Sequence, residues 1–387
     1  MKIFFIVFVS IFSYFNYLVA RYYSNAFNLS GKMNIAFWIF NVLATASIFA
    51  APYVYRVYPE RNPGFFYNAL QWSGYFFFGI YSVLFLFVFL NSTGLYVYEK
   101  FSAPSEERRN FLKLMVAGVS LSATGMMSVA GFVEARMKPV VKKVKVPLPH
   151  LPDEFHGVTI LQLSDIHVGQ TIKGDFVETL VQMSNELKPD MVVLTGDLID
   201  GLHSHLAHEL DSFKNIEAPL GRFMIPGNHE YYWGVDHWME FWRGLGYKTL
   251  INEHTLVEKN GTKIAMGGVH DYSASHTDGS LVSSPEEAFK GLPADITKIL
   301  LAHQPRSLYK ALKAGVHFQI SGHTHSGQYF PYNLLIYLFQ PYVKGLHHHE
   351  EKMWIYVNQG TGYWGPPSRF GVPPEITLIE LIKQPVA

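Results

Sequence analysis

Long uncharged runs fill the first third of the chain, and short apolar runs separated by polar turns fill the remainder. The uncharged runs lie at about 3–20, 33–55, 72–96 and 114–133. About 20 apolar residues in a helix cross the hydrocarbon core of a bilayer, so the pattern predicts a transmembrane region of about four helices over residues 1–133. The alternative is a buried helical bundle, which the length of the runs and their few charges disfavour.

A basic segment rich in proline follows at residues 134–152 and predicts an extended linker. Beyond it, an amphipathic helix is predicted near 176–187, and the dipeptide Asn260-Gly261 predicts a hairpin turn. Strand-like apolar runs lie at 158–164, 191–195, 222–226, 298–301, 318–320, 354–357 and 376–382. Strand–helix alternation followed by a hairpin predicts an α/β domain with layers around two sheets, at residues 153–387.

Composition sharpens this division. The chain has 387 residues, of which 49% are hydrophobic and 16% charged, and its formal net charge is zero. Nine Lys and Arg, four Asp and Glu and no His lie in 1–133, so 22 basic, 27 acidic and all 18 His residues lie in 134–387. The absence of a basic surplus argues against a nucleic-acid binder. The absence of Cys excludes disulfides, thiolate zinc sites and cysteine nucleophiles.

A pair of arginines precedes the fourth apolar run. Residues 107–113 resemble the twin-arginine export signal R-R-x-F-L-K, through Arg108 and Arg109. A twin-arginine translocase reads such a signal and moves folded domains, so the domain behind it is expected to be extracytoplasmic. The alternative is a pair of cytoplasmic anchor arginines, and the basic residues between Arg136 and Lys145 slightly favour it. We give the export signal more weight, because its apolar sequel also fits.

Polar residues with metal-binding side chains follow the apolar strand runs. In order, they are Asp165, His167, Asp197, Asn228, His229, His303, His323 and His325. Sites in open α/β sheets form outside the carboxyl ends of strands, so these residues are expected to meet. A mixture of oxygen and imidazole ligands suits Mn²⁺, Fe or Zn²⁺. The number of ligands exceeds what one ion needs and suits two ions with a bridging carboxylate.

The order Asp-x-His, Gly-Asp, Gly-Asn-His-Glu, His and Gly-His-x-His resembles the calcineurin-like metallophosphoesterase superfamily over about 150–387. The tail around Gly360-x-Gly362 and Gly365-Pro366-Pro367 is similar to its membrane-tethered or twin-arginine-exported bacterial branch. The resemblance implies a four-layer α/β/β/α sandwich. It also implies an integral protein of the bacterial inner (cytoplasmic) membrane.

Carried over by position, the resemblance implies a role for each residue. Asp165, His167 and His325 would hold one metal ion. Asn228, His303 and His323 would hold the other, and Asp197 would bridge both. His229 would protonate the leaving oxygen while a metal-bound hydroxide attacks phosphorus. The expected cofactors are two divalent ions, Mn²⁺ first, with Fe or Zn²⁺ as alternatives.

The leading hypothesis is a membrane-anchored metal-dependent phosphoesterase that hydrolyses phosphodiester or pyrophosphate bonds. Lipids or other envelope components are its expected substrates. A phosphomonoesterase would use the same site, and a non-catalytic metal-binding scaffold or sensor is the alternative outside enzymes. A nuclease is disfavoured because the domain is net acidic.

The uncharged residues 329–342 predict either a helix packed on the sandwich or an apolar flap that lies on the bilayer beside the site.

Overall fold

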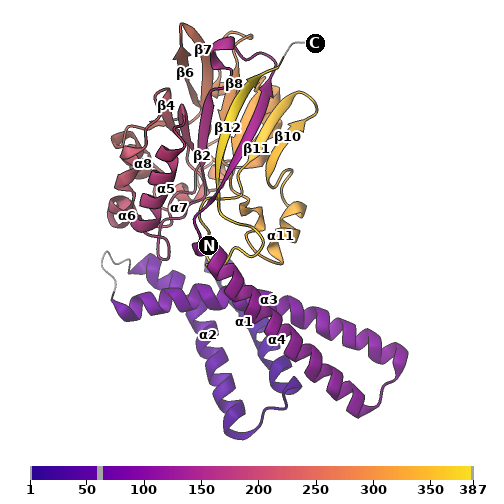
Figure 1. Cartoon of the computed structure of the whole chain (residues 1–387). Helices are drawn as coiled ribbons and strands as arrows, with labels where there is room; N and C mark the ends of the chain where they lie inside the picture. The colour runs from indigo at the N-terminus through magenta and orange to yellow at the C-terminus, as the bar shows by residue number, and fades with distance from the viewer. Residues whose placement is uncertain (1, 59–63, 385–387) are drawn as a thin grey trace. The chain divides into compact units, whose positions relative to one another are not determined.

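The computed structural model describes residues 2–58 and 64–384. The chain forms two compact units. The first consists of the N-terminal helices up to Arg136 together with Gly365–Phe370, and the second contains the rest of the chain. Figure 1 shows the course of the chain through both units.

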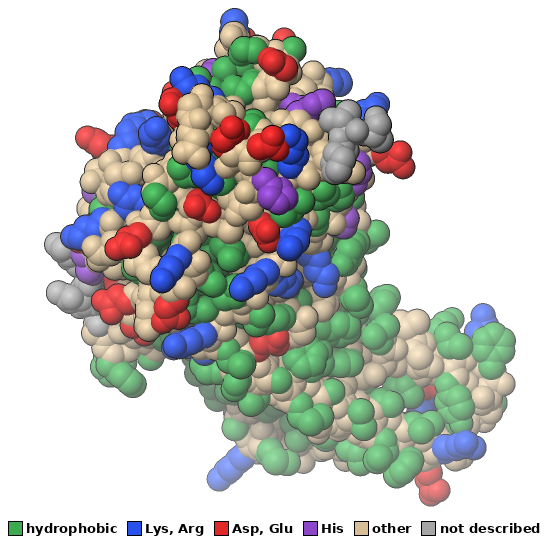
Figure 2. All heavy atoms as spheres, turned by 45° about the horizontal axis from the view of Figure 1, so that its top comes forward, with side chains coloured by type: hydrophobic (Ala, Val, Ile, Leu, Met, Phe, Trp, Pro, Cys, Tyr) green, Lys and Arg blue, Asp and Glu red, His purple; other side chains and the backbone are tan. Residues whose placement is uncertain are grey.

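Four long helices make up the first unit, and each contains one of the four predicted apolar runs. They are α1 (Lys2–Ala26), α2 (Gly31–Val57), α3 (Phe65–Ser102) and α4 (Glu106–Arg136). Among the described residues, α2, α3 and α4 are long and apolar enough to cross a membrane. Their outward side chains include Val42, Leu43 and Val119, which are exposed, and Figure 2 shows hydrophobic side chains gathered over the helices. Such surfaces suit contact with lipid rather than with water.

The helical unit also contains the short segment Gly365–Phe370 from near the end of the chain. The backbone N–H of Arg369 donates a hydrogen bond to the carbonyl of Gly131 on α4 at 2.9 Å. A Cβ at position 131 would lie 2.3 Å from Oγ of Ser368 and 3.3 Å from the backbone nitrogen of Phe370, so glycine favours this close approach of the segment to α4. Residues distant in sequence therefore complete the helical unit.

The second unit contains two six-stranded sheets, as the sequence predicts. The first has the order β1-β12-β2-β3-β4-β5, and the second has the order β10-β11-β9-β8-β7-β6. The strands are β1 (Val140–Leu148), β2 (Thr159–Leu163), β3 (Met191–Leu194), β4 (Gly221–Met224), β5 (Lys248–Thr249), β6 (Glu253–Lys259), β7 (Thr262–Gly268), β8 (Lys298–Leu301), β9 (Phe318–Ser321), β10 (Gly345–His349), β11 (Met353–Val357) and β12 (Glu375–Lys383). Asn260 and Gly261 form the predicted hairpin turn between β6 and β7.

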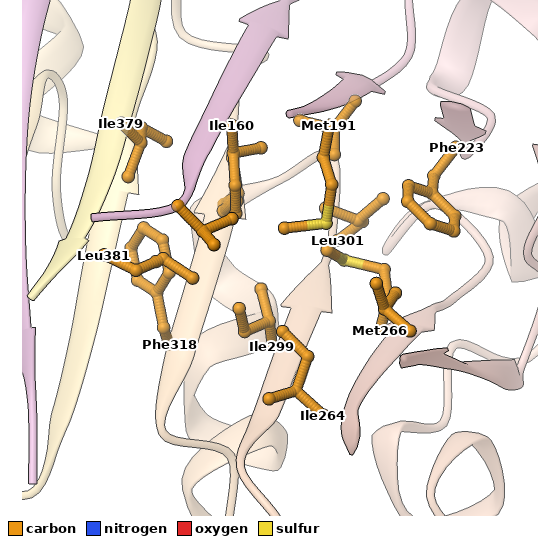
Figure 3. Packing of buried hydrophobic residues seen from close by; sticks show 14 of the residues in the cluster. Ile160, Met191, Phe223, Ile264, Met266, Ile299, Leu301, Phe318, Ile379 and Leu381 are labelled. Atoms are coloured by element: carbon orange, nitrogen blue, oxygen red, sulfur yellow. The ribbon is translucent and has the colours of Figure 1, made fainter. Parts of the chain in front are cut away.

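The two sheets face each other across a hydrophobic core. Figure 3 shows Ile160, Met191 and Phe223 of the first sheet packed with Ile299 and Phe318 of the second. All of these side chains are fully buried, which is the main stabilising contribution to such a sandwich. Strands buried on both faces read as continuous apolar runs, and this explains why the sequence revealed them.

Helices cover the outer faces of both sheets. Figure 1 shows α5, α6 and α8 grouped beside the first sheet. On the second sheet, α9 and α10 pack through Ala288, Leu308 and Ala311 against Leu300 and Ile355. The helices of this unit are α5 (Gly174–Glu186), α6 (His203–Leu210), α7 (Asn228–Tyr232), α8 (Val235–Gly244), α9 (Pro285–Ala288), α10 (Leu308–Lys313) and α11 (Tyr332–Leu335). The predicted four-layer α/β/β/α sandwich is confirmed.

The middle of the segment expected to be a linker, nine of its 19 residues, belongs instead to the first sheet. Residues Val140–Leu148 form β1, which pairs in parallel with β12. Val146 and Leu148 enter the core, and the ammonium group of Lys142 lies 2.5 Å from the carboxylate of buried Glu375. The basic residues thus alternate with core residues along an edge strand, where lysine and proline are tolerated.

Candidate metal centre

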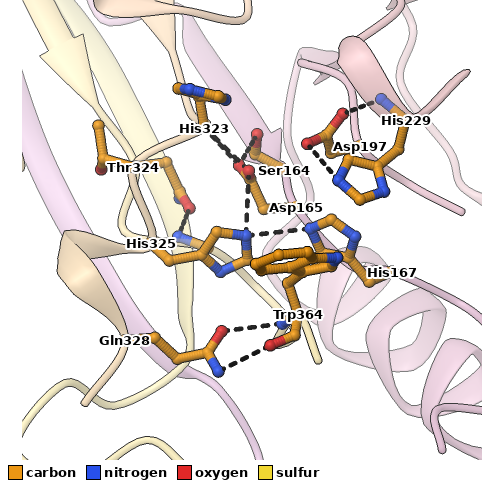
Figure 4. A network of polar contacts seen from close by, with 12 residues as sticks. Ser164, Asp165, His167, Asp197, His229, His323, Thr324, His325, Gln328 and Trp364 are labelled. Carbon is orange, nitrogen blue, oxygen red and sulfur yellow. Dashed lines mark hydrogen bonds and ion pairs between the residues drawn. The ribbon is translucent and has the colours of Figure 1, made fainter. Parts of the chain in front are cut away.

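The eight polar residues singled out from the sequence lie together at the carboxyl ends of the central strands. Asp165 and His167 follow β2, Asp197 follows β3, His303 follows β8, and His323 and His325 follow β9. Asn228 and His229 begin α7, shortly after β4. Because β2, β3 and β4 are parallel, as are β8 and β9, their carboxyl ends share one edge in each sheet. Figure 4 shows six of the eight side chains converging there.

The backbone at this edge turns sharply rather than running extended. Asp165, His167, Asp197, His323 and His325 all have positive φ, between 47° and 71°. Side chains two apart on an extended strand would also share a face, but that is not how Asp165 and His167 come together here. Non-glycine residues in this region cost free energy and cluster at functional sites. The surrounding fold therefore holds five candidate ligands in strained positions.

One group of potential ligands consists of Asp165, His167 and His325, whose ligand atoms all lie within 4.8 Å of one another. The Nε2 atoms of the two imidazoles are 3.0 Å apart, and Nε2 of His325 lies 3.4 Å from Oδ1 of Asp165. The Asp165 carboxylate accepts the backbone N–H of His323 through both oxygens, at 2.9 and 3.0 Å. This bond ties the turn after β2 in the first sheet to the turn after β9 in the second.

A second group consists of Asp197, His303 and His323. Nε2 of His303 lies 3.1 Å from Oδ2 of Asp197 and 3.2 Å from Nδ1 of His323. Asp197 also belongs to a third group, with His167 and His229, so the three groups overlap in His167 and Asp197. The ligand atoms therefore form a continuous cluster rather than separate sites.

The hydrogen bonds around the cluster suit a resident cation. Nδ1 of His303 lies 2.8 Å from the carbonyl oxygen of Thr195, so Nδ1 carries a proton and Nε2 faces Asp197. Nδ1 of His167 lies 3.2 Å from Oδ2 of Asp200, which leaves its Nε2 lone pair toward His325. Such outer partners fix the tautomer of metal-binding histidines. Oδ1 of Asn228 is buried and accepts no hydrogen bond from any residue within 2–58 and 64–384.

Burial and neighbouring charges shift the pKa values of these groups. Burial lowers the pKa of His323 to about 3, assisted by the charge of nearby His303, and a neutral imidazole is what a metal ion requires. Burial raises the pKa of Asp165. Burial also opposes ionisation of Asp197, but His303 and His229 outweigh it and hold the pKa of Asp197 well below its usual value.

His229 points its Nε2 toward the cluster and its Nδ1 toward Asp200. Nε2 lies 3.9 Å from Oδ2 of Asp197, and Nδ1 makes a short hydrogen bond to Oδ1 of Asp200. Burial disfavours the charged imidazole, yet Asp200 and Asp197 overcome it and raise the pKa of His229 to about 9. A histidine oriented by a carboxylate in this way can deliver a proton from its free nitrogen.

Glu230 holds the backbone next to the ligand cluster, a role that the sequence analysis did not anticipate. Its fully buried carboxylate accepts the backbone N–H groups of Asp197, Leu198 and Gly227, at 2.9, 2.8 and 2.7 Å. One side chain thus joins the turn after β3 to the start of α7. A Cβ at Gly227 would lie 2.2 Å from Oδ1 of Asp197, so glycine is required where these turns meet. The only available signal was the position of Glu230 directly after His229.

Two half-exposed aromatic rings flank His229. The ring of Tyr232 is centred 5.3 Å from that of His229, and the ring of Trp364 is 5.8 Å away. Gln328 holds the main chain of Trp364 through two hydrogen bonds, drawn in Figure 4, at 2.9 and 2.8 Å. Trp364 lies 135 positions from His229 in the sequence and was not anticipated.

The fold and the site define a class of protein. Facing α/β sheets with Asp, Asn and His gathered at their carboxyl ends are the framework of a metal-dependent hydrolase. The family model described as calcineurin-like phosphoesterase matches residues 158–327. This span includes all eight residues of the candidate centre.

Known proteins of similar sequence are also described as metallophosphoesterases. The chain is 35% identical to "Transmembrane protein with metallophosphoesterase domain" from Danio rerio, over 78% of this chain and 71% of that protein. It is 37% identical to "Uncharacterized metallophosphoesterase" from Helicobacter pylori strain 26695, over 71% of each chain. It is 31% identical to a Bacillus subtilis metallophosphoesterase, over 71% of this chain and 97% of that one. The chain therefore belongs to the calcineurin-like metallophosphoesterases and is a hydrolase of phosphoric esters.

Proposed function

We propose that this chain is a membrane-anchored phosphodiesterase or pyrophosphatase whose site holds two divalent ions. The observation that supports this is the continuous cluster of ligand atoms, in which three groups overlap through His167 and Asp197. Seven oxygen and imidazole ligands are more than a single ion takes up, and they suit a pair of ions. We propose Mn²⁺ as the first candidate, with Fe or Zn²⁺ as alternatives, because the ligands combine oxygen and imidazole donors.

In this proposal, Asp165, His167 and His325 would hold one ion. Asn228, His303 and His323 would hold the second ion, and Asp197 would contribute to both. Divalent ions bound there would polarise the phosphoryl oxygens and lower the pKa of water to supply a nucleophile.

His229 would protonate the leaving oxygen through Nε2, since Asp200 occupies its Nδ1. Glu230 would keep Asp197 and the start of α7 at a fixed separation, because it accepts backbone N–H groups from both turns.

A substrate with an apolar portion fits the surroundings of His229. The exposed rings of Tyr232 and Trp364 can pack against an apolar leaving group, on the side from which His229 delivers its proton. Three helices able to cross a membrane accompany the domain. These features favour a phosphodiester or pyrophosphate carried by a lipid or another envelope component.

Hydrolysis assays with the purified full chain in nanodiscs test this function. With Mn²⁺ added, we expect a higher kcat/KM for a bis-aryl phosphate than for an aryl monophosphate. EDTA should abolish turnover and Mn²⁺ should restore it, because the bound ions would stabilise the negative charge that develops on the phosphoryl oxygens. Preference for the monoester would point to a phosphatase. Turnover that survives EDTA would contradict the metal-dependent mechanism.

We further propose that the phosphoesterase domain lies outside the cytoplasm of a bacterial cell. Arg108 and Arg109 lie in the first turn of α4, where a twin-arginine translocase could read them. Arg109 also lies 4.0 Å from Glu99 and 3.9 Å from Glu106. A protease added to intact spheroplasts should therefore digest the domain, and replacing both arginines by lysine should prevent this. Protection of the unmodified domain would place it in the cytoplasm instead.

A further inference from the structure

The segment between the metal centre and β10 carries an exposed apolar surface. It contains α11 and a following 3₁₀ turn, Ile336–Leu338. Leu334, Leu338 and Phe339 are 63%, 76% and 61% exposed. We call the exposed side chains of this segment the apolar patch: Leu334, Leu335, Tyr337, Leu338 and Phe339. The prediction of a helix packed on the sandwich therefore does not hold for these side chains.

The chemistry of the patch suits the surface of a bilayer. No charged residue occurs within 329–342. At its border, exposed Arg306 donates a hydrogen bond from Nη2 to the carbonyl of Phe339 at 2.5 Å, and Lys344 is exposed. Elements that lie in the membrane interface combine leucine and aromatic side chains with basic residues that reach the lipid phosphates.

The segment that carries the patch is anchored at both ends beside the candidate ligands. Thr324, between His323 and His325, donates from Oγ1 to the carbonyl of Val343 at 2.6 Å and so closes the segment into a loop. Within the loop, the rings of Tyr329 and Tyr332 pack at 5.3 Å. The patch therefore has a fixed position relative to the metal centre and is not a loose tail.

The short connection between α4 and β1 limits how far the start of β1 can lie from the end of α4. The apolar run of α4 ends near residue 133, α4 itself ends at Arg136, and β1 begins at Val140. Only residues 137–139 lie between α4 and β1. Extended chain spans at most about 3.5 Å per residue, so this connection reaches roughly 14 Å. An apolar surface this exposed on a soluble monomer would be an aggregation hazard, whereas beside a bilayer it has a natural partner.

We propose that the apolar patch enters the interface of the phospholipid bilayer and presents the metal centre to phosphoesters at headgroup level. The inference deepens the proposed function and rests on it for the chemistry of the site. Contact between the patch and lipid does not itself require catalysis, so the two can be tested separately.

A nitroxide label tests the contact directly. The chain has no Cys, so Leu338→Cys gives a single labelling site in the full chain, reconstituted in phosphatidylcholine–phosphatidylglycerol nanodiscs. Electron paramagnetic resonance measures collisions of the label with oxygen, which concentrates in lipid, and with a water-soluble nickel chelate. Labels at Val119 on α4 and at Leu256 on β6, both exposed, provide the lipid and water references. We expect the label at 338 to resemble the one at 119.

Two outcomes would overturn the proposal. A label at 338 as accessible to the nickel chelate as the one at 256 would show that the patch lies in water. A label shielded from both reagents would show that protein, such as a second copy of the chain, covers it.

An activity assay separates lipid contact from catalysis. Leu338→Asn should lower turnover of a phosphodiester lipid in the same bilayer by about tenfold, because the interfacial element loses apolar contact. Turnover of a soluble bis-aryl phosphate should not change. If the variant and the unmodified chain hydrolysed the bilayer substrate at the same rate, the proposed contact between the apolar patch and lipid would be contradicted. If the unmodified chain hydrolysed neither substrate, the proposed function would fail, while the label would still decide whether the patch contacts lipid.

Discussion

Asp197→Ala is expected to abolish turnover and to reduce the metal content of the purified chain from two ions to one or none. The Asp197 carboxylate is the only one shared by two of the three ligand groups. In the proposed arrangement, its removal would take a ligand from both ions and an anion from between their charges, so kcat/KM should fall by at least about 10³-fold. Elemental analysis after dialysis, together with the bis-aryl phosphate assay, measures both effects.

Asp190→Ala is the matched control for that substitution. Asp190 precedes β3, whereas Asp197 follows it. The Asp190 carboxylate accepts hydrogen bonds from the backbone N–H and the hydroxyl of Thr159, both at 2.8 Å. Its loss should cost some stability and leave the metal content unchanged. An Asp197→Ala chain that still holds two ions would falsify the bridging role, even if it were inactive.

The convergence of the eight candidate residues could be predicted because they follow strands that the sequence makes visible. Asp165, Asp197 and His303 each come directly after a short apolar run that is buried on both faces. The rule that parallel strands end at a common edge then brings these side chains together without knowledge of the tertiary structure. The same rule applies separately to each sheet, and the sequence order of the motifs indicated that both sheets contribute.

The local geometry could not be predicted, because it depends on contacts across the sheets. Asp165 and His167 adopt positive φ, which neither residue type favours on its own. Their turn is fixed by the hydrogen bond from the backbone N–H of His323 to Asp165 and by that of His167 to the carbonyl of Asp197. These partners are 158 and 30 positions away, and no local pattern encodes them.

Strand β1 was missed because its charges obscured its pattern. Lys142, Lys143 and Lys145 alternate incompletely with valine, and Pro147 is a residue that strands usually avoid. Burial of Val146 and pairing with β12 outweigh these preferences. A period of two in Val144, Val146 and Leu148 was the available signal.

Glu230 illustrates a different limit of prediction from the sequence, because its partners are backbone groups. A carboxylate that accepts three backbone N–H groups has no partner that a sequence could reveal. Its burial beside Asp197 raises its pKa to about 7, so the free energy needed to bury it is recovered only through those hydrogen bonds. Supporting residues of this kind become visible only when the turns they join are seen together.

His229→Ala is expected to keep both ions and to lose most of the chemistry. His229 is not needed in either proposed ion set, but its Nε2 faces the cluster while Asp200 holds its Nδ1. A general acid contributes about 10²–10⁴-fold to the rate, and the loss should depend on the leaving group. Bis-(4-nitrophenyl) phosphate, whose leaving group needs little protonation, should lose the least, and diesters with alkyl leaving groups should lose the most.

A series of diesters with leaving groups of increasing pKa measures that dependence. The slope of log kcat against leaving-group pKa should be shallow in the unmodified chain and steeper in His229→Ala, because the proton then has to come from water. His203→Ala is the control, since His203 packs against Trp238 at 5.3 Å and belongs to none of the ligand groups. Parallel slopes for the unmodified chain and His229→Ala would mean that His229 binds or orients the phosphate instead of donating a proton to the leaving oxygen.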